Sequence, residues 1–245
     1  MPIASTFTSI HETKFTVSFD QCYPNGFIRY TDLCNVLQLT AGNHADLGGI
    51  SFTDMQQNDQ AWVLSRMRLE IVLLPKWRDA ITVKTWIVSL ENSRSVRALE
   101  VYSGDEKLVG CETFWAVFNT KTRRPEALAL PHEHFEKFGE RYPTAHRVKK
   151  IDVSDARELV KTRSVLLSDI DIVKHVNNVK YLEWCLDMEA SEDILSGKIQ
   201  SLDMNFMSEL MLGDKIDIRR DSSAEKTIMT IEKNERACFA LEIGT

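Results

Sequence analysis

The chain has 245 residues, of which 43% are hydrophobic and 27% charged, a composition typical of a soluble globular protein with a sizeable core. Its 30 Lys and Arg against 36 Asp and Glu give a net charge of −6, which argues against nucleic acid as a partner, because such binders neutralise phosphates. No apolar run reaches the roughly 20 residues of a membrane span, and we expect no secretory signal and no membrane partner. Five widely spaced cysteines indicate reduced core thiols in a cytoplasmic protein, with no metal site.

The first half of the chain is predicted to contain one long helix and several strands. An alternating pattern predicts a strand at 15–19, and turn residues at 23–26 separate it from a helix that Thr31 caps and that ends near 48–49. One stripe of that helix is formed by Leu33, Leu37, Ala41 and His44. Alternation also predicts strands at 63–73, 82–88, 95–102 and 108–118, the last two as a hairpin.

The second half repeats this order of elements. A strand is predicted at 163–167, a turn at 168–176 and a helix at 177–194. The apolar stripe of this helix contains Val179, Leu182 and Leu186. Further strands are predicted at 202–209, 215–219, 227–231 and 237–242. The segment 79–83 of the first half corresponds to 214–218 of the second, so the two halves follow one plan.

Between the halves, 131–138 is predicted as a short helix and 142–150 is polar and basic. Each half contains a helix that is apolar on more than one face, and a curved antiparallel sheet around the helix supplies the burial that it needs. The predicted fold class is therefore α+β, with two such units in tandem. We place the N-terminal unit at 1–130, a connector at 131–150 and the C-terminal unit at 151–245.

The segment most informative about function is the predicted turn and helix start at 168–184. It contains two acids, a histidine and two amides, namely Asp169, Asp171, His175, Asn177 and Asn178. A helix N-terminus gathers unpaired N–H groups and partial positive charge. An acid and a histidine beside it can act on a carbonyl whose oxygen becomes negative. We expect backbone N–H groups of 176–179 to bind that oxygen.

Residues 169–184 resemble the active-site motif of acyl-acyl carrier protein (acyl-ACP) thioesterases, and Asp171, His175, Asn177, Asn178 and Tyr181 resemble hot-dog thioesterases more generally. Four further segments match the same family in the correct order, namely 39–45, 62–67, 75–79 and 120–125. The resemblance covers the chain from about residue 14. It implies a tandem hot-dog fold and hydrolysis of the thioester that joins a fatty acyl chain to the phosphopantetheine arm of acyl carrier protein, which terminates fatty acid synthesis. No cofactor is implied, because the arm belongs to the substrate.

The resemblance carries three catalytic residues onto this sequence: Asp171, His175 and Glu209. The family has an asparagine two places after the aspartate, where this chain has Val173, so that amide's role has no candidate here. Some members have a cysteine after the glutamate, where this chain has Leu210. A thiol mechanism therefore has no candidate at this position, and whether water or a carboxylate attacks first stays open.

Laying one half over the other suggests a single active site in the second half. Tyr23 then falls opposite Asp171, Phe27 opposite His175, and Leu74 opposite Glu209. The first half would be free to hold the acyl tail. We predict substrate binding by Asn177 and Asn178 at the helix start and by a first-half pocket lined by Leu37, Trp62, Leu64 and Trp86.

Several of these residues have a plainer interpretation. Asp171 could serve only the turn, Asn177 and Asn178 could be helix caps, and His44 could be a hydrogen-bonded core residue. Packing is the simplest role for Cys185, and two histidines at 132 and 134 are a weak metal signal. A set of basic residues could dock an acidic carrier protein or simply be solvated, namely Lys121, Arg123, Arg124, Arg147, Lys149 and Lys150.

Two alternative functions share this site. The chain could hydrolyse acyl-CoA, or it could be a non-catalytic acyl-thioester-binding module of the same fold. A dehydratase is disfavoured, because no His followed shortly by Pro-Gly precedes the second helix. The sequence leaves open the acyl chain length, the choice between carrier protein and CoA, and whether two chains form a homodimer.

Overall fold

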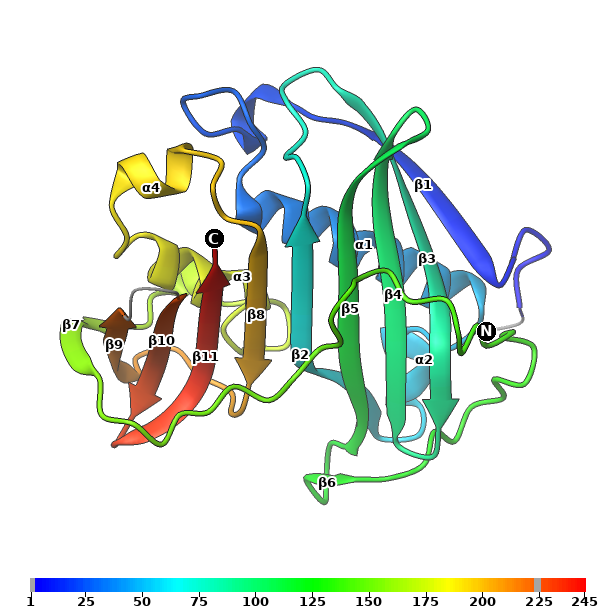
Figure 1. Ribbon diagram of the computed structural model, residues 1–245. Coiled ribbons are helices and arrows are strands. Elements are labelled where there is room, and N and C mark those ends of the chain that lie inside the picture. Colours follow the sequence, from blue (N-terminus) through cyan, green and yellow to red (C-terminus); the bar gives the residue numbers. More distant parts are fainter. Residues whose placement is uncertain (1–2, 223–225) are drawn as a thin grey trace. The chain divides into compact units, whose positions relative to one another are not determined.

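The computed structural model describes residues 3–222 and 226–245, which divide into two compact units (Figure 1). Unit 1 contains Met1–Ser65 and Val72–Val148, and unit 2 contains Arg66–Ile71 and Lys149–Thr245. The strand β2 (Gln60–Ile71) therefore gives its first half to unit 1 and its second half to unit 2. Within the described ranges, no helix is both long and apolar enough to span a membrane.

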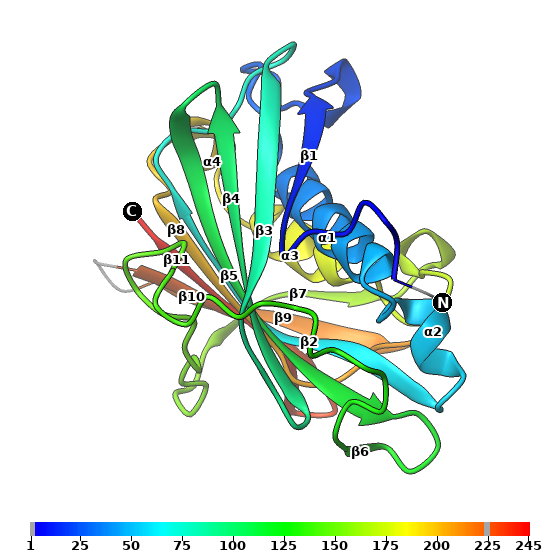
Figure 2. The same cartoon turned by 90° about the vertical axis from the view of Figure 1, so that its right-hand side faces the viewer.

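Unit 1 consists of an antiparallel sheet with one long helix along one of its faces (Figure 2). Besides the first half of β2, its elements are β1 (Ile10–Thr16), η1 (Phe19–Gln21), α1 (Tyr30–Leu47), α2 (Phe52–Gln56), β3 (Ala80–Glu91), β4 (Arg94–Ser103), β5 (Glu106–Asn119) and β6 (Arg124–Pro125). The strands follow one another in the order β1, β3, β4, β5 and the first half of β2, and β6 pairs with β5. The hairpin predicted for β4 and β5 is confirmed.

The predicted α1 helix is confirmed, but its N-cap lies two residues earlier than expected. Its N-cap is Arg29 rather than Thr31, and Thr31 is buried inside the first turn. Asp32 lies in the first turn, where the helix dipole favours a negative charge. Its carboxylate accepts a hydrogen bond from the Arg29 guanidinium at 2.6 Å. Leu33 and Leu37 are fully buried, as the apolar stripe predicts.

His44 joins α1 to the sheet through a buried polar network. Its Nδ1 lies 2.8 Å from Nη1 of Arg97, and its Nε2 lies 3.0 Å from the carbonyl oxygen of Thr8. Because arginine can only donate, Nδ1 is the acceptor and Nε2 carries the proton. Burial, reinforced by the charge of Arg97, lowers the pKa of His44 to about 3. His44 is thus a hydrogen-bonded core residue, as the plainer interpretation held.

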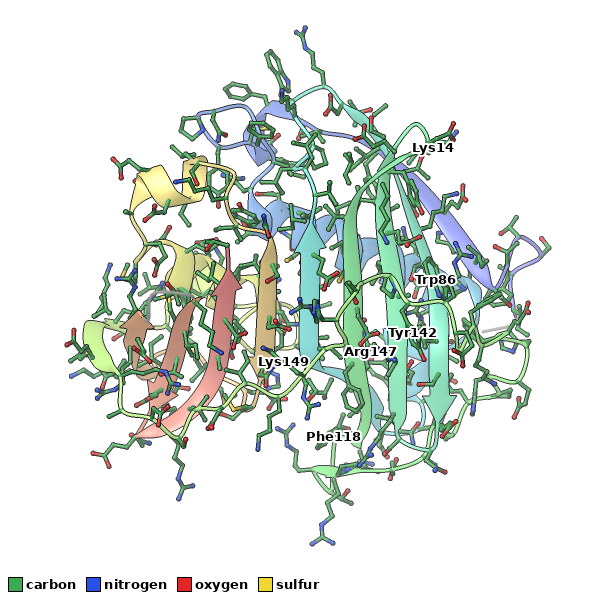
Figure 3. All side chains as sticks on the ribbon, viewed as in Figure 1. Lys14, Trp86, Phe118, Tyr142, Arg147 and Lys149 are labelled. Atoms are coloured by element: carbon green, nitrogen blue, oxygen red, sulfur yellow. The ribbon has the colours of Figure 1, made fainter. Side chains whose placement is uncertain are left out.

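The opposite face of this sheet is covered by residues 138–148. Trp86 lies on this face (Figure 3) and is fully buried. Its indole N–H donates to the carbonyl of Arg141 at 3.0 Å, and the Arg141 guanidinium lies 4.0 Å from the centroid of its ring. The Glu112 carboxylate accepts from Nε of Arg147 at 2.6 Å and from the backbone N–H of Val148 at 2.9 Å. Buried carboxylates need such partners, so Glu112 fixes the end of this segment.

The short helix predicted at 131–138 is wrong. The segment forms turns, and the backbone N–H of Phe138 bonds to Ile87 of β3 while the Phe135 side chain enters the core beside Ile50 and Met55. The segment must insert the Phe135 ring into the core and also pair its backbone with β3. A single helix cannot make both contacts. Tertiary contacts therefore override the local helical preference of this segment.

Unit 2 repeats the plan of unit 1 with a shorter helix. Besides the second half of β2, its elements are β7 (Glu158–Ser164), η2 (Leu167–Asp169), α3 (Asn178–Leu186), α4 (Ser191–Leu195), β8 (Ser201–Phe206), β9 (Lys215–Ser222), β10 (Lys226–Lys233) and β11 (Arg236–Gly244). The strands of its sheet follow one another in the order second half of β2, β8, β11, β10, β9 and β7. A buried ion pair between Arg68 and Asp203 joins the second half of β2 to β8.

Two predicted elements of unit 2 end earlier than expected. The helix predicted at 177–194 stops at Leu186, and the turn that follows is held by an ion pair in which the partly exposed Arg220 donates to the buried Glu189 carboxylate at 2.7 Å. The strand predicted at 202–209 stops at Phe206, since the next two N–H groups both bond to the single carbonyl of Cys238 and the ladder cannot continue. Glu209 consequently lies in a loop.

Gly110 allows β5 to approach the segment 131–148 closely. A Cβ at this position would collide with the carbonyl oxygen of Pro143, and backbone cannot move aside as a flexible side chain does. We expect Gly110→Ala to lower the free energy of unfolding by about 1–3 kcal/mol in urea titrations. The matched control is Gly42→Ala in α1, where a Cβ meets open space and alanine should stabilise the protein by about 0.5–1 kcal/mol. Equal stability of Gly110→Ala and wild type would contradict this packing.

The buried His44 predicts a specific acid sensitivity. Its pKa is about 3 in the folded protein against 6.5 ordinarily, so below pH 6.5 the unfolded chain binds a proton that the folded chain does not. The resulting stabilisation is present above pH 6.5 and is lost as the pH falls toward 3, by about 1.4 kcal/mol per pH unit.

His44→Gln removes this titration and keeps one acceptor and one donor. Urea unfolding at pH 7, 6 and 5 should show the stability of wild type falling toward that of the variant. Parallel pH profiles of the two proteins would refute this role of His44.

Candidate active site

The predicted turn at 168–176 contains a tight loop from Asp171 to His175 in unit 2. The N–H of Asp171 donates to the carbonyl of His175 at 2.9 Å, and the N–H of Lys174 donates to the carbonyl of Asp171 at 3.0 Å. Lys174 adopts a positive φ of 67°, an unusual backbone conformation for a residue with a side chain. Oδ1 of Asp171 accepts from the N–H of Val173 at 2.9 Å and more weakly from that of His175 at 3.4 Å. The carboxylate therefore supports the turn that presents His175.

His175 and Glu209 lie together although 34 positions separate them in the chain. Nδ1 of His175 is 3.5 Å from Oε1 of Glu209, with 27% of the histidine side chain and 33% of the glutamate side chain exposed. Partial exposure leaves both groups accessible to a substrate. The structure thus brings together two of the three predicted catalytic side chains, and it places Asp171 in the same turn as His175.

A backbone hydrogen bond aligns the two segments that carry His175 and Glu209. The N–H of Val176 donates to the carbonyl of Leu210 at 2.9 Å, so 175–176 runs beside 209–210. The loop containing Glu209 is closed by Asp214, whose Oδ2 accepts the N–H of Met211 at 2.9 Å. The side chains that precede the bonded residues, His175 and Glu209, are therefore neighbours.

The two asparagines stand at the start of α3. Asn177 is the N-cap, and its Oδ1 accepts the N–H of Val179 at 3.1 Å. This is the capping role of the plainer interpretation. Asn178 is the first residue of the helix. Neither placement tests the predicted contact with substrate.

Three of the four backbone N–H groups expected to bind the substrate oxygen, those of Val176, Asn177 and Val179, are already bonded within unit 2. Val176 donates to Leu210, Asn177 donates to the carbonyl of Asp169 at 2.9 Å, and Val179 donates to the Asn177 side chain. Folding of the loop and capping of the helix use these donors within unit 2. A donor already bonded inside the protein is poorly placed to hold a substrate oxygen.

Unit 1 forms the same turn with different side chains. The N–H of Tyr23 donates to the carbonyl of Phe27 at 2.8 Å, and that of Gly26 donates to the carbonyl of Tyr23 at 2.9 Å. Gly26 has a φ of 82° at the position of Lys174. Since Tyr23 forms the turn without a carboxylate, the turn does not by itself require Asp171.

The partner loop is repeated as well. The N–H of Ile28 donates to the carbonyl of Pro75 at 2.8 Å, which matches the bond from Val176 to Leu210. Leu74 precedes Pro75 and is buried, whereas the corresponding Glu209 is partly exposed. The matched bonds support the predicted alignment of Tyr23, Phe27 and Leu74 with the three catalytic candidates.

Three of the predicted pocket residues belong to the interior of unit 1. Leu37 and Leu64 are buried, and Trp62 packs against the hydrophobic cluster containing Ile50 while its indole N–H donates to the Ile50 carbonyl at 3.2 Å. Trp86 lies on the other face: its neighbour Thr85 bonds to Arg97 on the α1 side, and strand side chains alternate. The Trp86 side chain therefore does not line a pocket beside α1.

The remaining candidates fit plain structural roles. Cys185 is fully buried, and burial raises the pKa of its thiol, as expected of a packing residue. The rings of His132 and His134 bond to the backbone carbonyls of Leu130 and Gly48, both at 2.9 Å. Among the predicted basic residues, ion pairs join Lys121 to Asp59, Arg147 to Glu112 and Lys149 to Glu242.

Comparison with known proteins places this arrangement in a family. Two family models, described as the N-terminal and C-terminal domains of acyl-ACP thioesterase, match residues 8–136 and 145–238. The palmitoyl-acyl carrier protein thioesterase of Cuphea hookeriana is 27% identical over 189 residues, 71% of this chain and 46% of the relative. That of Gossypium hirsutum is 29% identical over 232 residues, 86% of this chain and 55% of the relative. The chain thus spans about half the length of these curated relatives.

Solved structures share the fold. An acyl-ACP thioesterase from Bacteroides thetaiotaomicron is 24% identical with a TM-score of 0.89, covering 96% of this chain and 97% of that one. The 12:0-ACP thioesterase from Umbellularia californica is 19% identical with a TM-score of 0.80, covering 97% of each chain. The predicted α+β tandem hot-dog fold is confirmed. Because the two family models match most of the sequence, this chain belongs to the acyl-ACP thioesterase family.

Proposed function

We propose that this chain hydrolyses fatty acyl-ACP to free fatty acid and carrier protein. The observation that carries the proposal is the contact of His175 with Glu209, 3.5 Å apart and partly exposed, in a chain of the acyl-ACP thioesterase family. An imidazole beside a carboxylate is a base oriented by an acid, the arrangement that activates water in many hydrolases. A binding module would have no use for it.

The chemistry follows from which ring nitrogen faces the carboxylate. In the proposed mechanism, the Nδ1–H of His175 points toward the Glu209 carboxylate, which holds the ring, and Nε2 is left to take a proton from water. The water oxygen bonds to the thioester carbon, the C–S bond then breaks, and the departing thiolate of the phosphopantetheine arm receives the proton from His175. The arm arrives with the substrate, and the reaction uses no cofactor of the protein's own.

Asp171 contributes its negative charge to the turn that carries His175. Its carboxylate lies against the N–H groups of Val173 and His175, and unit 1 shows that the backbone turn forms without it. We therefore assign the carboxylate to electrostatic support of the imidazolium that forms when His175 accepts a proton. Val173 has an apolar side chain at the family's asparagine position, so it cannot supply the role of that amide.

The remaining assignments stay predictions. These are the binding of the acyl tail by unit 1, the docking of acyl carrier protein on basic side chains, the association of two chains and a cytoplasmic location. Hydrolysis of acyl-CoA by the same site is an outcome that the assay below separates, because the thioester is identical and only the carrier differs.

His175→Ala and Glu209→Gln test the catalytic pair. We expect kcat for acyl-ACP to fall by about 100-fold or more in His175→Ala, which removes the base, and by about 10- to 100-fold in Glu209→Gln, which keeps the shape and removes the charge. Fatty acid release is measured over acyl-ACP and acyl-CoA substrates of graded chain length.

The matched control is Glu183→Gln, which changes a partly exposed acid on α3 that pairs with Lys180. Its turnover should equal that of wild type. Normal turnover by His175→Ala would remove this residue from the mechanism, whereas a wild-type chain that binds acyl-ACP without releasing fatty acid would be a binding module.

Asp171→Asn separates the charge of Asp171 from its support of the turn. The amide keeps an oxygen that accepts the Val173 N–H, so we expect an unchanged midpoint of thermal unfolding and a kcat at least about 10-fold lower. Circular dichroism and the acyl-ACP assay provide the two measurements. Full activity in Asp171→Asn would leave Asp171 with a turn-forming role alone.

A further inference from the structure

Tyr181 is buried in unit 2 and contacts the loop that carries Glu209. Its hydroxyl oxygen accepts the backbone N–H of Leu210 at 3.1 Å. The carbonyl of the same residue accepts the N–H of Val176 at 2.9 Å. Both polar groups of Leu210 are thus bonded, one to the side chain of α3 and one to the segment that contains His175. The peptide directly after Glu209 is fixed from two directions.

The phenol ring is itself immobilised by aromatic neighbours. Only 3% of Tyr181 is exposed, and its ring centroid lies 5.7 Å from that of Trp184, 6.0 Å from Phe206 and 5.3 Å from Phe239. A ring packed on three sides cannot follow a moving loop, so its hydroxyl is a fixed point. Burial raises the pKa of Tyr181 well above its ordinary value, so the hydroxyl stays neutral and does not titrate in the working range.

Unit 1 provides an internal comparison for this hydrogen bond. There the residue matching Leu210 is Pro75, which has no N–H, and the residue matching Tyr181 is Leu33, which has no hydroxyl. The other bond to this loop is kept, since Ile28 donates to Pro75. The plan shared by the two units therefore requires the Val176–Leu210 bond and does not require the Tyr181–Leu210 bond.

We propose that Tyr181 is a positioning residue, which holds Glu209 against His175 through the backbone of Leu210. The hydrogen bond occurs in the unit that has the acid and the histidine and is missing where both are replaced. The distance from Nδ1 of His175 to Oε1 of Glu209 is 3.5 Å, at the outer limit of a hydrogen bond, so a loop shift of a few tenths of an ångström breaks the contact. This inference rests on the proposed thioesterase activity.

Tyr181→Phe removes the hydroxyl and leaves the aromatic packing in place. We expect kcat for acyl-ACP to fall about 10- to 100-fold with KM within about twofold of wild type, because substrate binding is untouched while the catalytic pair loses its alignment. A merely structural hydroxyl would change stability without this split between kcat and KM.

The decisive measurement is a double-mutant cycle with Glu209→Gln. If Tyr181 acts through Glu209, then Tyr181→Phe costs little further activity once the carboxylate is gone, so the double variant resembles Glu209→Gln alone. Independent, multiplying losses in the double variant would overturn the proposal. A Tyr181→Phe variant with wild-type kcat would overturn it as well.

Tyr30→Phe is the matched control, because Tyr30 is a buried tyrosine of α1 whose hydroxyl has no hydrogen-bond partner among the described residues. Its kcat should equal that of wild type. Wild-type protein without fatty acid release would refute the proposed function rather than this inference, whereas active wild type and fully active Tyr181→Phe would refute the inference alone.

Discussion

One backbone hydrogen bond, from the N–H of Val176 to the carbonyl of Leu210, holds two distant segments of unit 2 side by side. The residues just before them, His175 and Glu209, are brought together by this pairing. Without this bond, a partly exposed imidazole and carboxylate in two loops would sample many relative positions. Bringing them into contact would then cost conformational entropy. The catalytic proposal, and the role of Tyr181 within it, both depend on this local register.

The two units show how one backbone scaffold serves two purposes. The turn at 171–175 and the turn at 23–27 share their hydrogen bonds and the positive φ at their fourth residue. Unit 1 places Gly26 at that strained position, where glycine is favoured, whereas unit 2 places Lys174 there. Unit 1 also ends its loop with Pro75, which gives up a backbone donor that unit 2 uses. Unit 1 therefore has glycine and proline at two positions where unit 2 has residues of the candidate site, Lys174 and Leu210.

Buried charge is handled by matched partners in both units. In unit 1, the guanidinium of Arg97 bonds to a histidine that burial keeps neutral, and the Glu112 carboxylate meets Arg147 and a backbone N–H. In unit 2, the buried Glu189 carboxylate pairs with the partly exposed Arg220 just beyond the end of α3. Such groups cost several kcal/mol when unpaired, so each pairing fixes the local path of the chain. These networks therefore decide details of the fold that apolar patterning leaves undetermined.

The sequence by itself determined the α+β class and the repeat, because hydrophobic periodicity and turn residues are local. Its resemblance to acyl-ACP thioesterases, carried by the motif around His175, supplied the catalytic candidates. Only the tertiary structure decided what depends on distant partners. It turned 131–138 from a predicted helix into turns through Phe135, and it placed Trp86 on the face away from α1. Alternation separates two faces of a strand without saying which one a helix covers. The bond from Leu210 to Tyr181 joins residues 29 positions apart, beyond any local pattern.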